Sequence, residues 1–173
     1  MNASPGVAHL HSGLQNAPRV KARWIFVALA IVAATLFTLS VQGGRWWSLA
    51  EVEIGPFGAT QCFGGDCRPA GLGWLGGTAR FERTGMAAWA GGLIAGFSLL
   101  VLAAGVASRR IPRLAAKTVL VATITALVAG IGFVVQFPGI EGAAIDRGLW
   151  LFVAAVVCSA ATAVAVLRAR PAT

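Results

Sequence analysis

Four long runs of apolar residues constrain the fold of this chain more than any other feature of its sequence. The runs cover residues 24–42, 86–107, 118–137 and 148–167, and none contains Asp, Glu, Lys, Arg or His. A helix needs about 20 apolar residues to cross a hydrocarbon core about 30 Å thick. Since 57% of the residues are hydrophobic and only 12% are charged, an ordinary soluble domain is excluded. The sequence predicts an all-α integral membrane fold, a bundle of four transmembrane helices.

The charges between the runs indicate the side of the membrane that each connection faces. The segment 108–117 is basic, whereas 138–147 carries Glu141 and Asp146. Because Lys and Arg accumulate in cytoplasmic connections, we expect 1–23, 108–117 and 168–173 to be cytoplasmic. All six acidic residues then fall in the outside segments 43–85 and 138–147. We interpret the first run as an uncleaved signal anchor, because it is longer than the apolar region of a signal peptide.

This topology also explains why basic residues outnumber acidic ones. The formal net charge is +8, but the basic residues flank apolar runs instead of gathering on a solvated face, which argues against a nucleic-acid partner. Arg greatly outnumbers Lys and Tyr is absent, a pattern typical of a GC-rich bacterial genome. We therefore expect the plasma (inner) membrane of a bacterium, with the lipid bilayer as the first partner.

The outside segment 43–85 is the only connection with room for a small folded ectodomain. Leu49, Val52 and Ile54 are interleaved with polar or small residues, which predicts a half-buried strand over 49–54. Gly and Pro punctuate the chain at 55–58, and a second short strand is expected over 59–63. We expect the residues that carry the function of the protein to lie in this loop.

Two cysteines surround a Gly-Gly pair in this loop. Gly64 and Gly65 suit the positive φ angles of a two-residue hairpin turn, which places Cys62 opposite Cys67. A non-hydrogen-bonded pair has Cα atoms about 4.5 Å apart, within the range of a disulfide. Since the topology places the loop in an oxidising compartment, we predict a Cys62–Cys67 disulfide that closes a small β ectodomain.

No residue constellation in the sequence indicates catalysis, a metal or a cofactor. The cysteine pair lacks the Cys-x-x-Cys spacing of redox motifs, and a zinc site would need further ligands. His9 and His11 are the only histidines and belong to the expected cytoplasmic tail, while Cys158 lies among small residues inside the fourth run. The runs also lack the ionisable groups that active transport requires. We expect a protein that is not an enzyme and has no small-molecule substrate.

Tryptophans and glycines are the remaining features with functional interpretations. Trp46 and Trp47 lie near a span end, as do Trp24, Trp89 and Trp150, so we expect interfacial anchors, with ligand stacking by the Trp46–Trp47 pair as the alternative. Trp74 either stacks on a partner or forms the core of the ectodomain. Gly92 and Gly96 form a small-xxx-small helix-packing pattern, used either within the bundle or against a partner helix.

The four spans, the short basic connection, and a first loop with strands, tryptophan and a close cysteine pair together resemble the claudin and peripheral-myelin-protein tetraspan superfamily. In that family the loop carries Trp, then Gly-Leu-Trp, then two cysteines, and forms a small sheet over the bundle. Trp46 or Trp47 stands in the place of the first Trp, and Gly55-Pro56-Phe57 stands roughly where Gly-Leu-Trp would be. Cys62 and Cys67 match the paired cysteines, and Arg80 or Arg83 matches an arginine before the second span.

The resemblance covers architecture over about 150 residues and its motif support lies in the first loop. It implies adhesion, sealing or association with other membrane proteins through the ectodomain. Our leading hypothesis is a non-enzymatic, claudin-like protein that contacts itself or another membrane protein through this loop. The ectodomain contact candidates are Trp46, Trp47, Phe57 and Trp74. The alternatives are an accessory subunit of a larger membrane complex, docked through Gly92 and Gly96, and an oligomeric passive pore.

Overall fold

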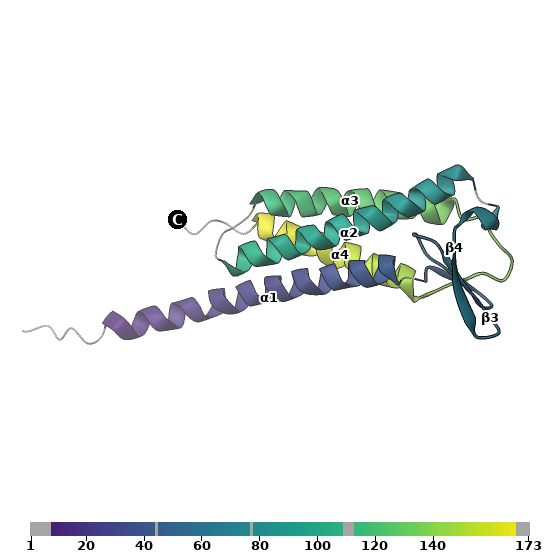
Figure 1. Cartoon of the computed structure of the whole chain (residues 1–173). Coiled ribbons are helices and arrows are strands. Elements are labelled where there is room, and N and C mark those ends of the chain that lie inside the picture. The colour runs from purple at the N-terminus through teal and green to yellow at the C-terminus, as the bar shows by residue number, and fades with distance from the viewer. Residues whose placement is uncertain (1–7, 44, 77, 109–112, 169–173) are drawn as a thin grey trace, which may run out of the picture.

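A computed structural model describes residues 8–43, 45–76, 78–108 and 113–168 of the chain. Four helices are long and apolar enough to cross a membrane. They lie side by side in a bundle, and a small sheet lies at one end, here called the sheet end (Figure 1). The opposite end is the far end. The helices are α1 (Ala8–Gln42), α2 (Ala79–Ala107), α3 (Arg113–Val135) and α4 (Arg147–Arg168), and a short 3-10 helix, η1 (Gly73–Leu75), precedes α2.

The four helices confirm the predicted bundle, but their bounds differ from the predicted spans. α1 begins at Ala8, so part of the segment assigned to a tail is helical, although its apolar span, Arg23–Gln42, agrees with 24–42. α2 begins at Ala79 instead of residue 86, because its first turns bury Phe81 at the sheet end. α3 runs from Arg113 to Val135 and not over 118–137. Hydropathy locates apolar stretches, whereas a helix continues wherever its backbone and packing allow.

Some expected segments lie outside the described residues. These are 1–7 and 169–173 of the two predicted tails and 109–112 of the predicted basic connection.

The four helices form a closed ring. α1 packs against α2 and α4, and α3 packs against the same two helices. Its interior is filled by apolar side chains such as Phe37, Leu99, Leu102 and Val119, all fully buried. The hydroxyl groups of Thr123 on α3 and Ser159 on α4 lie 2.6 Å apart and are buried. Close packing and such polar contacts drive helix association where lipid replaces water.

The sheet is antiparallel and has the strand order β4-β3-β2-β1-β5. One face rests on the sheet end of the bundle through alternate apolar residues, which include Trp47, Val52, Ile54 and Ala59. This confirms the expected small disulfide-closed sheet. The strands are β1 (Trp47–Leu49), β2 (Val52–Ile54), β3 (Ala59–Phe63), β4 (Asp66–Ala70) and β5 (Ala144–Ile145).

The single strand predicted over 49–54 is wrong, because the chain turns back within it. Leu49 pairs with Val52 across a tight turn, in which Ala50 has a φ of 49°. The apolar residues at 49, 52 and 54 do not keep a strict period of two. Leu49 is out of phase with Val52 and Ile54 in a period of two. This break in the alternation indicates a hairpin instead of one continuous strand. The strand expected over 59–63 is confirmed as β3.

The fifth strand comes from the connection between α3 and α4. Trp47 of β1 lies opposite Ile145 of β5, so both loops at the sheet end share one sheet. A strand of two residues carries no recognisable periodicity, so the sequence alone did not predict β5. The pairing links α4 to the loop that follows α1.

Candidate functional site

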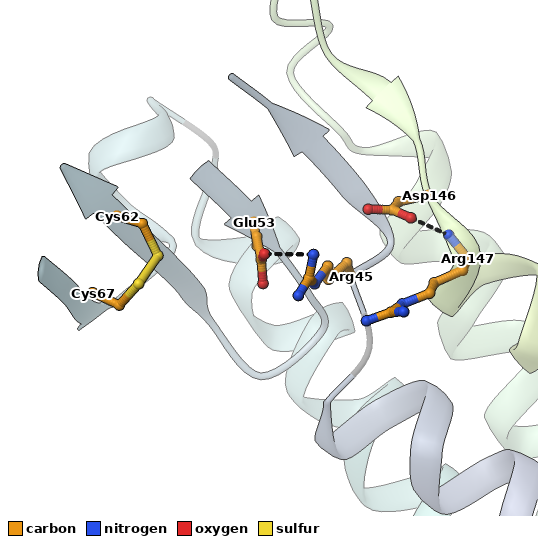
Figure 2. A network of polar contacts seen from close by, with 6 residues as sticks. All are labelled: Arg45, Glu53, Cys62, Cys67, Asp146 and Arg147. Carbon is orange, nitrogen blue, oxygen red and sulfur yellow. Dashed lines mark hydrogen bonds and ion pairs between the residues drawn. A yellow bond between two sulfur atoms is a disulfide. The ribbon is translucent and has the colours of Figure 1, made fainter. Parts of the chain in front are cut away.

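The cysteine hairpin has the geometry expected from its sequence. Cys62 lies opposite Cys67 and Phe63 opposite Asp66, and the two cysteines form a disulfide. Gly64 and Gly65 have φ angles of 60° and 91°, a conformation that glycine adopts without steric cost. The predicted register and disulfide are confirmed. The pair joins the two outermost strands on one side of the sheet (Figure 2).

β4 is an edge strand whose backbone groups are open on one side. The amide of Cys62 donates a hydrogen bond to the carbonyl of Glu51, so the Cys62–Cys67 pair is a non-hydrogen-bonded pair. The N–H and C=O of Cys67 therefore point away from β3. The backbone of Pro69 also faces the open side. Because proline has no N–H, this position has no unpaired hydrogen-bond donor. Residues 66–69 are exposed, and the β3–β4 hairpin projects beside the bundle (Figure 1).

Trp46 and Trp47 are not part of the exposed surface. Trp46 is 0% exposed and Trp47 5% exposed, so their assignment as ectodomain contact candidates and as interfacial anchors is corrected. Trp46 packs against Phe133 and Phe152, and its indole N–H donates a hydrogen bond of 2.9 Å to the carbonyl of Ser40. Trp47 stacks on Phe137. The two rings form the aromatic core that joins the sheet to the bundle.

Phe57 and Trp74 have exposed side chains, as a contact role requires. Phe57 is 63% exposed and packs on one side against Trp89 of α2, with ring centroids 4.8 Å apart. Trp74 lies in η1 and is 46% exposed. Phe63 was not among the predicted contact residues, and it is 63% exposed beside the hairpin turn. The sequence feature that could have identified Phe63 as an exposed contact residue is its position directly before the Gly64-Gly65 turn.

An ion pair that sequence reasoning missed lies at the junction of α1 and the sheet. Arg45 Nη1 and Glu53 Oε1 are 2.7 Å apart, and both side chains are partly exposed. Figure 2 shows the two groups pointing toward each other. They line a hollow of about 290 Å³ whose other walls come from the end of α1, from β3 and β4, and from the turn that contains Phe57. Only the return of the chain through β1 and β2 brings residues 45 and 53 together.

The start of α4 is fixed beside this hollow by backbone contacts. The amide of Gly148 donates a hydrogen bond of 2.8 Å to the carbonyl of Arg45, and the amide of Asp146 donates one of 2.9 Å to the carbonyl of Trp46. The carboxylate of Asp146 accepts a hydrogen bond from the amide of Arg147 (Figure 2). A carboxylate at this position also interacts favourably with the helix dipole.

Gly92 and Gly96 pack within the bundle. A Cβ atom on Gly92 would lie 2.8 Å from Val41 Cγ1, and one on Gly96 would lie 3.4 Å from the carbonyl oxygen of Ala34. Both neighbours belong to α1, so the intramolecular interpretation of the pattern is confirmed. The alternative in which a partner helix docks on this face stays a prediction, and such a helix would have to replace α1, which covers the face in this structure.

The described residues contain no group of three or more His, Cys, Asp and Glu side chains placed to hold a metal ion. Among the described residues, the charged side chains lie outside the apolar runs 24–42, 86–107, 118–137 and 148–167. Cys158 is a partly buried free thiol inside α4. The acidic residues among the described residues all lie at the sheet end, where the edge strand β4 and the Arg45–Glu53 pair are the candidate contact features.

Comparison of the chain with protein-family models, curated proteins and solved structures finds no match.

Proposed function

We propose that this chain is a non-enzymatic, claudin-like membrane protein that makes protein–protein contacts through the edge strand β4 of its ectodomain. The single observation that carries the proposal is the open edge of β4, which is exposed, held by a disulfide and lies beside an exposed aromatic residue. An open strand edge is a template for pairing with another chain. The resemblance to claudin and peripheral-myelin-protein tetraspans is part of this proposal.

A second copy of the chain is the partner whose chemistry fits this edge best. In an antiparallel pair centred on Cys67, the open N–H and C=O of the two Cys67 residues would bond to each other. The same register places Asp66 of one copy opposite Arg68 of the other, twice, because the pair is symmetric. Opposite charges at directly opposed positions stabilise a strand pair. Phe63, with 63% of its surface exposed, lies close to this contact.

Photo-crosslinking in native membranes tests this contact. A photoreactive amino acid in place of Phe63 is expected to give crosslinked dimers, whereas the same group in place of Ile94, an exposed residue on α2, is the control for random collisions. Arg68→Asp places acids opposite each other and should weaken self-association about tenfold. The double variant Asp66→Arg with Arg68→Asp restores both pairs and should restore the dimer.

The outcomes of this experiment separate two partners. Crosslinks from position 63 to a different membrane protein would support the contact function with that partner instead of a second copy. Monomers alone, with crosslinkers at positions 63, 68 and 74, would refute the proposal.

We further propose that the sheet end faces outside the cell and that both termini are cytoplasmic in a bacterial inner membrane. All six acidic residues belong to segments at the sheet end. In the described part of the chain, the charged side chains at the far end are all basic, namely Arg23, Arg113, Lys117 and Arg168. This is the distribution of cytoplasmic segments.

Thiol labelling checks this orientation. After reduction, a membrane-impermeant maleimide is expected to label Cys62 and Cys67 in intact cells, because both lie on the exposed hairpin. In a variant with both cysteines replaced by Ser and Ala172→Cys added, labelling should require permeabilised cells. Labelling of position 172 in intact cells would reverse the proposed topology.

A further inference from the structure

The hollow that contains Arg45 and Glu53 lies where the apolar surface of the bundle ends. The apolar span of α1 ends at Gln42, and Val41 and Gln42 form one wall of the hollow. The polar headgroup layer of a bilayer begins at this depth, since it covers the several ångströms on each side of a hydrocarbon core of about 30 Å. Phe57 lines the hollow and packs on Trp89. Trp89 has an amphipathic indole ring, and such rings favour the same layer.

The hollow presents one positive and one negative group. Arg45 contacts Glu53 through Nη1 only, within the described part of the chain, which leaves its other N–H groups to bind an anion. A guanidinium is well suited to phosphate because its donors form a planar fork. Glu53 attracts a cation, and the carbonyl groups at the end of α1 add a partial negative charge beside it. Both side chains are accessible, with 41% and 32% of their surfaces exposed.

We propose that this hollow binds the headgroup of a zwitterionic phospholipid with a primary ammonium group, phosphatidylethanolamine in chemical class. Arg45 binds the phosphate and Glu53 binds the ammonium group. The volume of about 290 Å³ lies at the lower end of the range for ligand pockets, so it accommodates a headgroup and not a whole lipid. The acyl chains lie outside it, against exposed apolar residues of α1 such as Leu39. This site is separate from the edge of β4 and does not depend on the contact proposed there.

Native mass spectrometry of the full chain tests the site. The protein is extracted from nanodiscs with equal amounts of phosphatidylethanolamine, phosphatidylcholine and phosphatidylglycerol, and the retained lipids are quantified. We expect retention of phosphatidylethanolamine about tenfold above the other two lipids, because each charge-assisted hydrogen bond changes affinity by that order. Phosphatidylcholine lacks N–H donors for Glu53, and phosphatidylglycerol lacks the cation.

Two substitutions give different expected patterns. Glu53→Gln should remove the preference for phosphatidylethanolamine over phosphatidylglycerol, whereas Arg45→Gln should lower the retention of both. The matched controls are Glu51→Gln and Arg83→Gln, which change charges outside the hollow and outside the β4 edge and should leave the pattern unchanged. Because a partly exposed ion pair contributes little to stability, the variants are expected to fold, and an unchanged thermal midpoint verifies this.

Three results would overturn the inference. They are equal retention of the three lipids by the unmodified chain, an unchanged preference in Glu53→Gln, and displacement of the retained lipid by soluble glycerophosphoethanolamine at equimolar concentration. The last result would assign the hollow to a soluble phosphate–ammonium ligand instead of a membrane lipid. The absence of dimers in the crosslinking experiment would not change the expected lipid retention. The β4 contact and the lipid site can therefore be refuted independently of each other.

Discussion

Trp46→Ala is expected to lower the free energy of unfolding by about 3–5 kcal/mol, the usual cost of removing a large buried aromatic side chain. The indole is 0% exposed and packs between Phe133 of α3 and Phe152 of α4. Its N–H donates a hydrogen bond to the carbonyl of Ser40 at the end of α1. The residue therefore holds three helices and the sheet together, and a cavity at this place has several walls that cannot all relax.

Reversible unfolding in mixed detergent micelles, followed by circular dichroism, measures this loss. Trp46→Phe keeps a ring but leaves the Ser40 carbonyl without its partner, so a smaller loss of about 1–3 kcal/mol is expected. Trp74→Ala is the matched control, because this indole is 46% exposed and its removal should change stability by about 0.5 kcal/mol or less. Equal effects of Trp46→Ala and Trp74→Ala would show that Trp46 is not the central packing residue.

Gly148→Ala is expected to destabilise the junction between α4 and the loop after α1 by about 1–3 kcal/mol through overpacking. A Cβ atom at this position would lie 2.6 Å from the carbonyl oxygen of Arg45. That neighbour is backbone and cannot rotate away. Separation of the two segments would also weaken the hydrogen bond from the Gly148 amide to the same carbonyl, which adds about 1 kcal/mol.

The same unfolding measurement checks this substitution. Gly71→Ala is the control, because a Cβ atom there would have no neighbour within 4 Å and its backbone does not adopt a positive φ. Hydrogen exchange should also show faster exchange of the amides of Asp146 and Gly148 in Gly148→Ala, since both donate to this loop. Unchanged stability and exchange would mean that the backbone at Arg45 can move without cost.

Local patterns predicted the parts of the fold in which the decisive partners are close in sequence. The Gly64-Gly65 turn determines the register of its own hairpin, so it also determines that Cys62 faces Cys67. The spans were located because about 20 consecutive apolar residues have one stable place in a membrane chain. The bounds of α2 were missed, since Phe81 lies before the apolar run and is buried only by its tertiary neighbours.

The candidate site was predicted in part. The sequence singled out Phe57 and Trp74, which are exposed, but it gave Trp46 and Trp47 the same role. An indole at a span end suits both the membrane interface and a buried core. The choice between them depends on Phe133, Phe137 and Phe152, which lie more than 80 residues later in the chain.

By itself, the sequence determined the number of apolar helices, the basic far end and the disulfide hairpin, because each depends on composition or on neighbours within a few residues. Only the tertiary structure decided what the ends of these segments contact. The pairing of β1 with β5, the packing of Gly92 against α1, and the meeting of Arg45 with Glu53 all join segments that have no local pattern in common. Such contacts form where backbone geometry brings complementary surfaces together, and that geometry exists only in the folded chain.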